Sequence, residues 1–459
     1  MEQLSPLDAA FLDVEDADPH AALAIGSVAV FAGPTPDPAA ARAAILAAMR
    51  TVPHTTQKVR RTPLDLTAPV WVDDPDFDPD NHLRRTALPA PGDDAELCEL
   101  VGRVMSSRMD RDHPLWESWV IEGLAGNRWA LLTKVHHSVA DGVSGSHLYE
   151  TALGDRPPTV PASSHCGPLR LLLRAVDPRK PIGVLCGAAR SPVRAGRRVI
   201  AAARGLVSLA AVALPADPSP LTGPLGSRRG YGVARASLPQ VAEIGRHFGA
   251  TVNDVVLTAV SAALRELLLS RGQAPSARAV RTLVPVSTRA AGEDTLDNRI
   301  SLLLPLLPVD IADPVEALHA VRARLGSAKR SDQTHAGTAV TDLAAYGPFA
   351  PISAAIRIAA RLPQRNIITV TTNVPGPRNP LSFLGSELVE LMPYVPLALR
   401  LRTGVAVLSY RDRLVFGVTT DAHSVPEVDL LTRTIERTIA ELAASTRPLG
   451  IPFSAKESG

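Results

Sequence analysis

The sequence predicts a mixed α/β protein built from two domains. Apolar, β-competent runs alternate with amphipathic helical patterns in both halves of the chain, which favours mixed α/β domains. The chain has 459 residues, a length that suggests two domains of roughly 150–200 residues each. A Pro-, Arg- and Ala-rich stretch separates the halves. We therefore divide the chain into an N-terminal domain (1–155), a basic amphipathic linker (156–225) and a C-terminal domain (226–459).

Composition narrows the class of protein. Hydrophobic residues make up 46% of the chain and charged residues 20%, which indicates a globular protein. The net charge of +2 gives no reason to expect nucleic-acid binding. The three cysteines lack C-x-x-C spacing, so we expect no disulfide framework and a reducing cytoplasm. No secretory signal and no apolar run of the ~20 residues that a spanning helix needs are recognisable.

In the first half, alternating or continuous apolar runs predict strands and a 3.6-residue period predicts helices. A turn at Ala125–Asn127 joins the last two strands into a hairpin. The predicted strands are Ala24–Phe31, Pro69–Pro75, Pro114–Leu124 and Trp129–Val135, and the predicted helices are Pro38–Arg50 and Ala95–Met109.

In the second half, the strongest prediction is a helix that starts at Thr251 and stops before Gly272. Thr251 and Asp254 have capping-box spacing, and apolar residues form one face. A rigid turn is expected at Asn373–Pro377. The other predicted elements are strands at Tyr231–Leu238, Arg281–Val286, Ile300–Val309 and Ile367–Thr372, helices at Pro314–Arg330 and Pro426–Ala444, a β-rich stretch at Leu388–Leu399 and a hairpin at Val405–Thr420.

The stretch Val135–Gly142 carries the clearest chemical signal. It places His136 and His137 where a strand ends, before a predicted helix at Ser144–Leu153. A neutral imidazole is well suited to take a proton from an alcohol at pH 7. Adjacent histidines on a strand point to opposite faces, so a purely structural pair is the alternative.

The two residues at the end of this motif suggest a turn and a helix cap, and the spacing of the histidines argues against a metal site. Gly142 permits a tight turn and close approach of a ligand. Asp141 has an alternative role as the cap of the following helix. A metal site is disfavoured because adjacent histidines rarely chelate one ion together and no third ligand has recognisable spacing.

Residues 165–205 form a strongly basic stretch. They contain nine basic residues and one acid, a charge of +8, so the remainder of the chain carries −6. Interleaved apolar residues make the stretch amphipathic. It is either an interfacial segment attracted to anionic lipid or a solvated linker between the domains.

Asn253 lies in the first turn of the predicted helix after Thr251. An amide at that position is next to unpaired backbone N–H groups and the positive end of the helix dipole, a setting that stabilises an oxyanion. Local capping of the helix is the alternative role.

The motif His136–Gly142 resembles H-H-x-x-x-D-G of the CoA-dependent acyltransferase superfamily and the related condensation domains. Further stretches narrow the resemblance to the bacterial wax ester synthase/acyl-CoA:diacylglycerol acyltransferase family, including its actinobacterial triacylglycerol synthases. These stretches are Leu4–Asp8, Trp71–Phe77, Pro114–Trp116 through Gly123–Leu124, Val252–Leu257, Pro285–Arg289 and Asn373–Pro377. The resemblance covers residues 4–445, with small departures at Thr288 and Glu427.

The resemblance implies two chloramphenicol-acetyltransferase-like domains with a tunnel at their interface. By position, His137 is the expected general base, and His136 and Asp141 are supporting members of the motif. The motif's aspartate pairs with an arginine in related folds, and Arg289 is the candidate here. Gly142, Asn253, Trp116 and Asn373 are expected to bind substrate, stabilise an oxyanion or support the site.

The implied reaction transfers a long-chain acyl group from acyl-CoA to diacylglycerol or a long-chain alcohol. Acyl-CoA is then a substrate, and no cofactor or metal is expected. The chain lacks a G-x-S-x-G elbow, which removes the usual support for a serine hydrolase. Two alternatives stay open: an acyltransferase of the same fold with another alcohol or amine as acceptor, and a non-catalytic lipid-binding paralogue. A cytoplasmic protein in peripheral contact with the membrane or with lipid droplets is expected.

Overall fold

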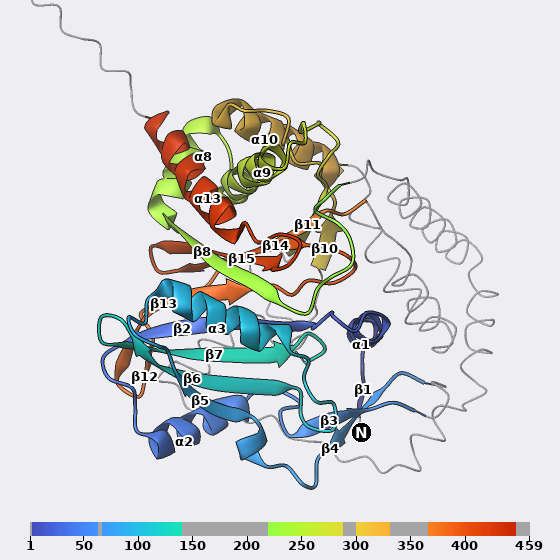
Figure 1. Cartoon of the computed structure of the whole chain (residues 1–459), viewed down its shortest axis with the longest axis vertical. Coiled ribbons are helices and arrows are strands. Elements are labelled where there is room, and N and C mark those ends of the chain that lie inside the picture. The colour runs from blue at the N-terminus through green and yellow to red at the C-terminus, as the bar shows by residue number, and fades with distance from the viewer. Residues whose placement is uncertain (1, 63–66, 140–218, 288–299, 331–365, 447–459) are drawn as a thin grey trace, which may run out of the picture.

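The computed structural model describes residues 2–62, 67–139, 219–287, 300–330 and 366–446, which form two lobes stacked on each other (Figure 1). The first lobe contains β1 (Glu2–Gln3), α1 (Pro6–Ala17), β2 (Ala24–Ala32), α2 (Pro38–Met49), β3 (Gln57–Arg60), β4 (Val70–Asp73), the 3₁₀ turn η2 (Pro79–Asn81), β5 (Leu83–Ala87), α3 (Asp94–Ser106), β6 (Trp116–Leu124) and β7 (Arg128–His136). The later segments contain β8 (Arg229–Ser237), α8 (Leu238–Phe248), α9 (Val252–Ser270), β9 (Thr282–Ser287), β10 (Ile300–Leu303), α10 (Pro314–Arg330), β11 (Thr369–Val374), β12 (Ser382–Phe383), β13 (Ser386–Tyr394), β14 (Thr403–Tyr410), β15 (Arg413–Asp421) and α13 (Val428–Ala444).

Each lobe is organised around a six-stranded mixed sheet. The first sheet has the order β12-β13-β2-β7-β6-β5, and the second has the order β10-β9-β11-β14-β15-β8. A small sheet, β1-β4-β3, lies beside the first. Strands β12 and β13 belong to the C-terminal half of the chain, yet β13 pairs with β2 of the first sheet. This hairpin therefore crosses the domain division proposed from the sequence.

Most predicted elements are confirmed, with shifts of a few residues at their ends. The strand expected at Ile300–Val309 was predicted too long: β10 ends at Leu303, before Pro305 and Pro308, which lack the N–H that a strand donates. The turn expected at Asn373 was also misplaced, because β11 continues through Val374. Helices α1 and α8 were not predicted.

Two hydrophobic cores support the lobes. In the first, Phe31 stacks on Trp129 across the β2–β7 pair, with ring centroids 4.5 Å apart. In the second, α9 is buried along most of its length among α8, α10 and α13, which cover one side of the sheet (Figure 1). The capping box that starts α9 is present as predicted, with Thr251 and Asp254 bonding each other's backbone N–H groups.

The lobes meet where α3 of the first lobe lies on β8 of the second (Figure 1). Gly102 of α3 allows this approach, since a Cβ there would lie 2.5 Å from the carbonyl oxygen of Arg229. The Arg229 guanidinium donates to the carbonyl of His20 in the first lobe and lies 3.5 Å from Asp421. Further along β8, Arg235 binds Glu390 of β13 and Asp94 of α3. The hydrogen bond of Arg229 to His20 at one end of β8, and the ion pairs of Arg235 near the other, thus join the lobes.

Candidate active site

His136 is the last residue of β7 and is fully buried, with 1% of its surface exposed. Its backbone N–H donates to the carbonyl of Leu115 (3.0 Å), so the segment before Trp116 anchors the strand end. The Nδ1 atom accepts from the backbone N–H of Ser138 (3.1 Å). In the neutral imidazole the proton is therefore on Nε2, which lies 3.7 Å from Oε2 of Glu15.

Glu15 of α1 is a buried carboxylate that touches several donors. It accepts from the backbone N–H of Leu23 (2.9 Å) and from Arg111 (2.6 Å). Burial alone would raise its pKa, but His136, Arg111 and the Leu23 N–H outweigh burial and lower the pKa to about 2. Glu15 is therefore ionised at neutral pH and presents a negative charge to His136.

His137 lies one residue beyond β7 and is only half-buried. Its backbone N–H donates to the carbonyl of Leu23 (2.9 Å). The backbone N–H of the same leucine donates to Glu15. Its imidazole stacks on the ring of Phe11, with centroids 3.8 Å apart and planes 24° from parallel. Phe11 and Glu15 are four residues apart on α1, so one face of this helix supports both histidines.

Lys134, two residues before His136, is a buried cation under the site. Its ammonium donates to the carbonyls of Val104 (3.0 Å) and Ser107 (2.8 Å) at the end of α3, and Glu117 lies 3.9 Å away. Burial lowers the pKa of Lys134. The positive charge meets the negative end of the α3 dipole, which fixes β7 against this helix.

Other predicted site residues are distributed over both lobes. Trp116 is a core residue with 1% exposure, and its indole N–H donates to the carbonyl of Thr55 (2.8 Å). Asn253 is half-buried in the first turn of α9, where Thr251 and Asp254 already provide the cap, so local capping does not account for it. Asn373 is half-buried near the end of β11.

The structure thus brings His136, His137 and Trp116 into one lobe and leaves Asn253 and Asn373 in the other. Asp141, Gly142 and Arg289 lie outside the described residues, as do the predicted helix at Ser144–Leu153 and the basic stretch at 165–205.

Phe11, Glu15 and Lys134 were not recognised from the sequence. One signal was available: Glu15 and Lys134 are charged residues at positions where the apolar pattern of their elements predicts burial. Which partners neutralise those charges depends on the packing of α1 and α3, which are distant along the chain from β7.

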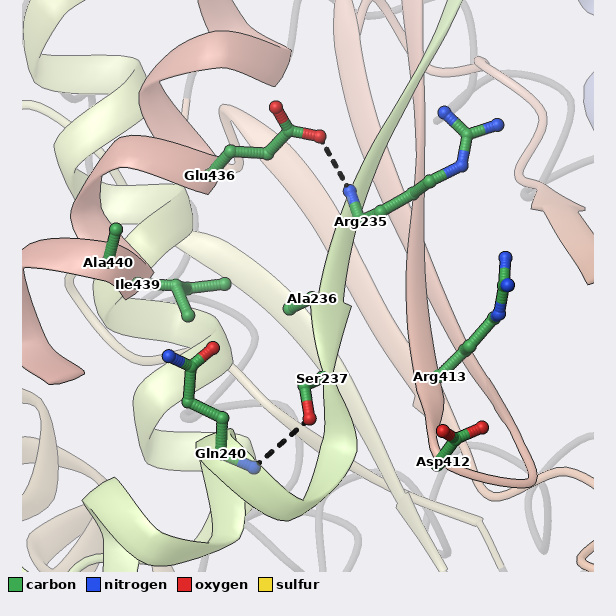
Figure 2. Close-up of a pocket in the computed structure, with 9 residues that line it drawn as sticks. All are labelled: Arg235, Ala236, Ser237, Gln240, Asp412, Arg413, Glu436, Ile439 and Ala440. Atoms are coloured by element: carbon green, nitrogen blue, oxygen red, sulfur yellow. Dashed lines mark hydrogen bonds between the residues drawn. The ribbon is translucent and has the colours of Figure 1, made fainter.

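A surface pocket of about 440 Å³ lies at the opposite end of β8 from Arg229 (Figure 2). None of the predicted site residues lines it. The side chains of Arg235 and Arg413 extend to the other side of β8 from Gln240 and Ile439, and the remaining lining residues are Ala236, Ser237, Asp412, Glu436 and Ala440.

The described residues contain neither a metal-binding cluster nor a helix suited to cross a membrane. No group of three His, Cys, Asp or Glu side chains within the described ranges is arranged to hold a metal ion. None of the helices in those ranges combines the length and apolar character that crossing a membrane requires.

Comparison with solved structures identifies the fold. The chain is similar to a wax ester synthase/diacylglycerol acyltransferase from Marinobacter aquaeolei VT8, with a TM-score of 0.67, 25% identity, and coverage of 97% of this chain and 99% of that one. It also matches the starter condensation domain of rhizomide synthetase, with a TM-score of 0.59, 15% identity, and coverage of 97% and 95%. The predicted mixed α/β acyltransferase fold is thereby confirmed.

Comparison of sequences identifies the family. Residues 4–256 match the wax ester synthase/diacylglycerol acyltransferase catalytic domain, and residues 296–443 match the C-terminal domain of the same family. A probable diacylglycerol O-acyltransferase of Mycobacterium tuberculosis and a putative one of Mycobacterium bovis are each 41% identical over 456 residues, covering 97% of both chains. The chain belongs to the wax ester synthase/diacylglycerol acyltransferase family of enzymes.

Proposed function

We propose that the protein transfers a long-chain acyl group from acyl-CoA to the free hydroxyl of diacylglycerol, with His137 as the general base. The observation that carries the proposal is the different placement of the two histidines. His136 is buried and faces Glu15, whereas His137 is half-exposed just beyond the strand. The mycobacterial relatives named diacylglycerol O-acyltransferases support the choice of acceptor.

The reaction needs no enzyme nucleophile because a thioester is already activated. Neutral His137 accepts the proton of the acceptor hydroxyl as the oxygen attacks the thioester carbonyl. The C–O ester bond forms, the C–S bond breaks, and the proton on His137 passes to the departing CoA thiolate. The products are triacylglycerol and free CoA.

The surrounding groups have supporting roles in this proposal. Hydrogen bonds to Leu115 and Leu23 hold the backbone of both histidines, which fixes the base relative to its substrate. Asn253, which is not used as a cap, is our candidate donor to the oxyanion. Asp141 and Arg289 are proposed to pair and shape the site, Gly142 to permit close approach of a ligand, and Trp116 and Asn373 to support the site.

The finer details of substrate and location belong to the same proposal. Long-chain alcohols are a second acceptor class, since the similar enzyme from Marinobacter is named as a wax ester synthase as well. Peripheral binding to an anionic membrane or lipid-droplet surface is proposed for the basic stretch at 165–205. Co-flotation with vesicles containing anionic lipid, lost at high salt, tests this surface contact.

The proposal predicts that His137→Ala removes most of the activity while the protein stays folded. General base catalysis supplies about 10²–10⁴-fold, and a loss in that range is expected. Purified protein is incubated with palmitoyl-CoA and either dioleoylglycerol or hexadecanol, and free CoA and neutral lipid are quantified together. Near wild-type turnover by His137→Ala would refute the assignment. Absence of CoA release by the wild type with every acceptor would favour a lipid-binding protein instead.

A further inference from the structure

The rings of Phe11 and His137 form a close face-to-face contact. Their centroids are 3.8 Å apart and the planes differ by 24°. Phe11 lies in the middle of α1, whereas His137 follows β7, so the contact joins two elements far apart along the chain. The two rings are only half-buried, in contrast to Phe31 and Trp129, which are fully buried in the core.

We infer that Phe11 is a positioning residue for His137: its ring orients the imidazole and stabilises the imidazolium that forms during proton transfer. This inference rests on the proposed role of His137 as general base. Stacking restricts rotation of the imidazole about its side-chain bonds. The negative face of an aromatic ring also attracts a cation, so the contact strengthens when His137 becomes positively charged.

The position of the ring depends on α1, which is fixed along its length. Ser5 caps the helix by accepting from the Asp8 N–H (3.1 Å). Near the C-terminal end, Arg108 donates to the carbonyls of Glu15, Asp18 and Ala21. Arg111 and Arg61 bind the acidic side chains of the helix: Arg111 pairs with Glu15 and Asp16, and Arg61 pairs with Asp13 and Asp16. The helix therefore holds Phe11 over the imidazole as a rigid support.

Charged groups lie on the elements around the histidine pair. They are Asp8, Asp13, Glu15 and Asp16 on α1, Arg108 and Arg111 after α3, Arg61 after β3, Lys134 on β7 and Arg229 on β8. Replacing Phe11 by leucine changes none of these charges. A shift in the titration of His137 in Phe11→Leu therefore reports the loss of the aromatic face.

Three variants separate this role from simple packing. Phe11→Leu removes the aromatic face and keeps an apolar side chain, and Phe11→Tyr keeps the face. Phe77→Leu is the matched control, because Phe77 is a half-buried ring that stacks on another histidine, His82, at 5.3 Å and 23°. The acid limb of kcat/KM against pH, from CoA release, is compared with the NMR titration of the His137 ring, which is assigned by its loss in His137→Ala.

In Phe11→Leu both the NMR titration and the acid limb are expected to move to lower pH by roughly half a unit, because the imidazolium loses its stabilising face. Phe11→Tyr and Phe77→Leu are expected to match the wild type in both. A Phe11→Leu protein whose His137 titration stays at the wild-type pH would overturn the inference, even if its thermal stability fell. Retained turnover in His137→Ala would instead refute the proposed function and, with it, the role of Phe11 in catalysis.

Discussion

Replacing Glu15 by glutamine tests whether the ionised carboxylate beside His136 stabilises the folded protein. The pKa of Glu15 is lowered from 4.5 to about 2 in the folded protein. One pKa unit corresponds to about 1.36 kcal/mol, so the ionised carboxylate contributes about 3 kcal/mol to the free energy of unfolding at pH 7. Its side chain is only 3% exposed, so solvent screening reduces this figure little.

The pH dependence follows from the direction of the shift. Because the folded-state pKa lies below the unfolded value, the stabilisation is complete above pH 4.5 and is lost as the pH falls through about 2. Glu15→Gln removes the charge, so it is expected to be less stable than the wild type at pH 7. The gap of about 3 kcal/mol should narrow progressively between those two pH values.

Urea unfolding at a series of pH values measures this gap. All four tryptophans belong to the first lobe, so their fluorescence reports unfolding of the lobe that contains Glu15. Asp16→Asn is the matched control, because Asp16 binds the same Arg111 but has a side chain that is 35% exposed. An exposed pair contributes about 0–1 kcal/mol, so this control should be nearly as stable as the wild type. A gap between the wild type and Glu15→Gln that did not change with pH would refute the reasoning.

Two further predictions concern groups around the site. Lys134→Met should lower the free energy of unfolding by about 1–3 kcal/mol, because it removes the hydrogen bonds that the buried ammonium donates to the carbonyls of Val104 and Ser107; urea unfolding measures this, and wild-type stability would contradict it. Asn253→Ala should lower kcat by about 10²–10³-fold if Asn253 binds the oxyanion. Thr251→Ala on the same helix should instead cost about 1 kcal/mol of stability and leave kcat unchanged. Equal kcat values for both α9 variants would exclude the oxyanion role.

The sequence predicted local structure well where the signal was local. The capping box of Thr251 and Asp254 set the start of α9, and the turn after Leu124 joined β6 to β7. Both depend on residues within a few positions of each other, so their physics is visible in a short window. The motif at His136 and His137 is likewise local, and it predicts the chemical centre from neighbouring residues alone.

The tertiary structure decided how that centre is built. The pairing of β13 with β2 and the docking of α1 against the end of β7 join segments that no local pattern connects. Burial of His136 beside Glu15, and the half-exposure of His137 beneath Phe11, follow from that docking. The two imidazoles are the same chemical group, and their different surroundings are the basis on which we propose different roles for them. The sequence by itself thus determined the local elements and predicted which residues carry the chemistry, whereas long-range packing decided what surrounds each of them, because burial and charge partners are properties of the folded chain.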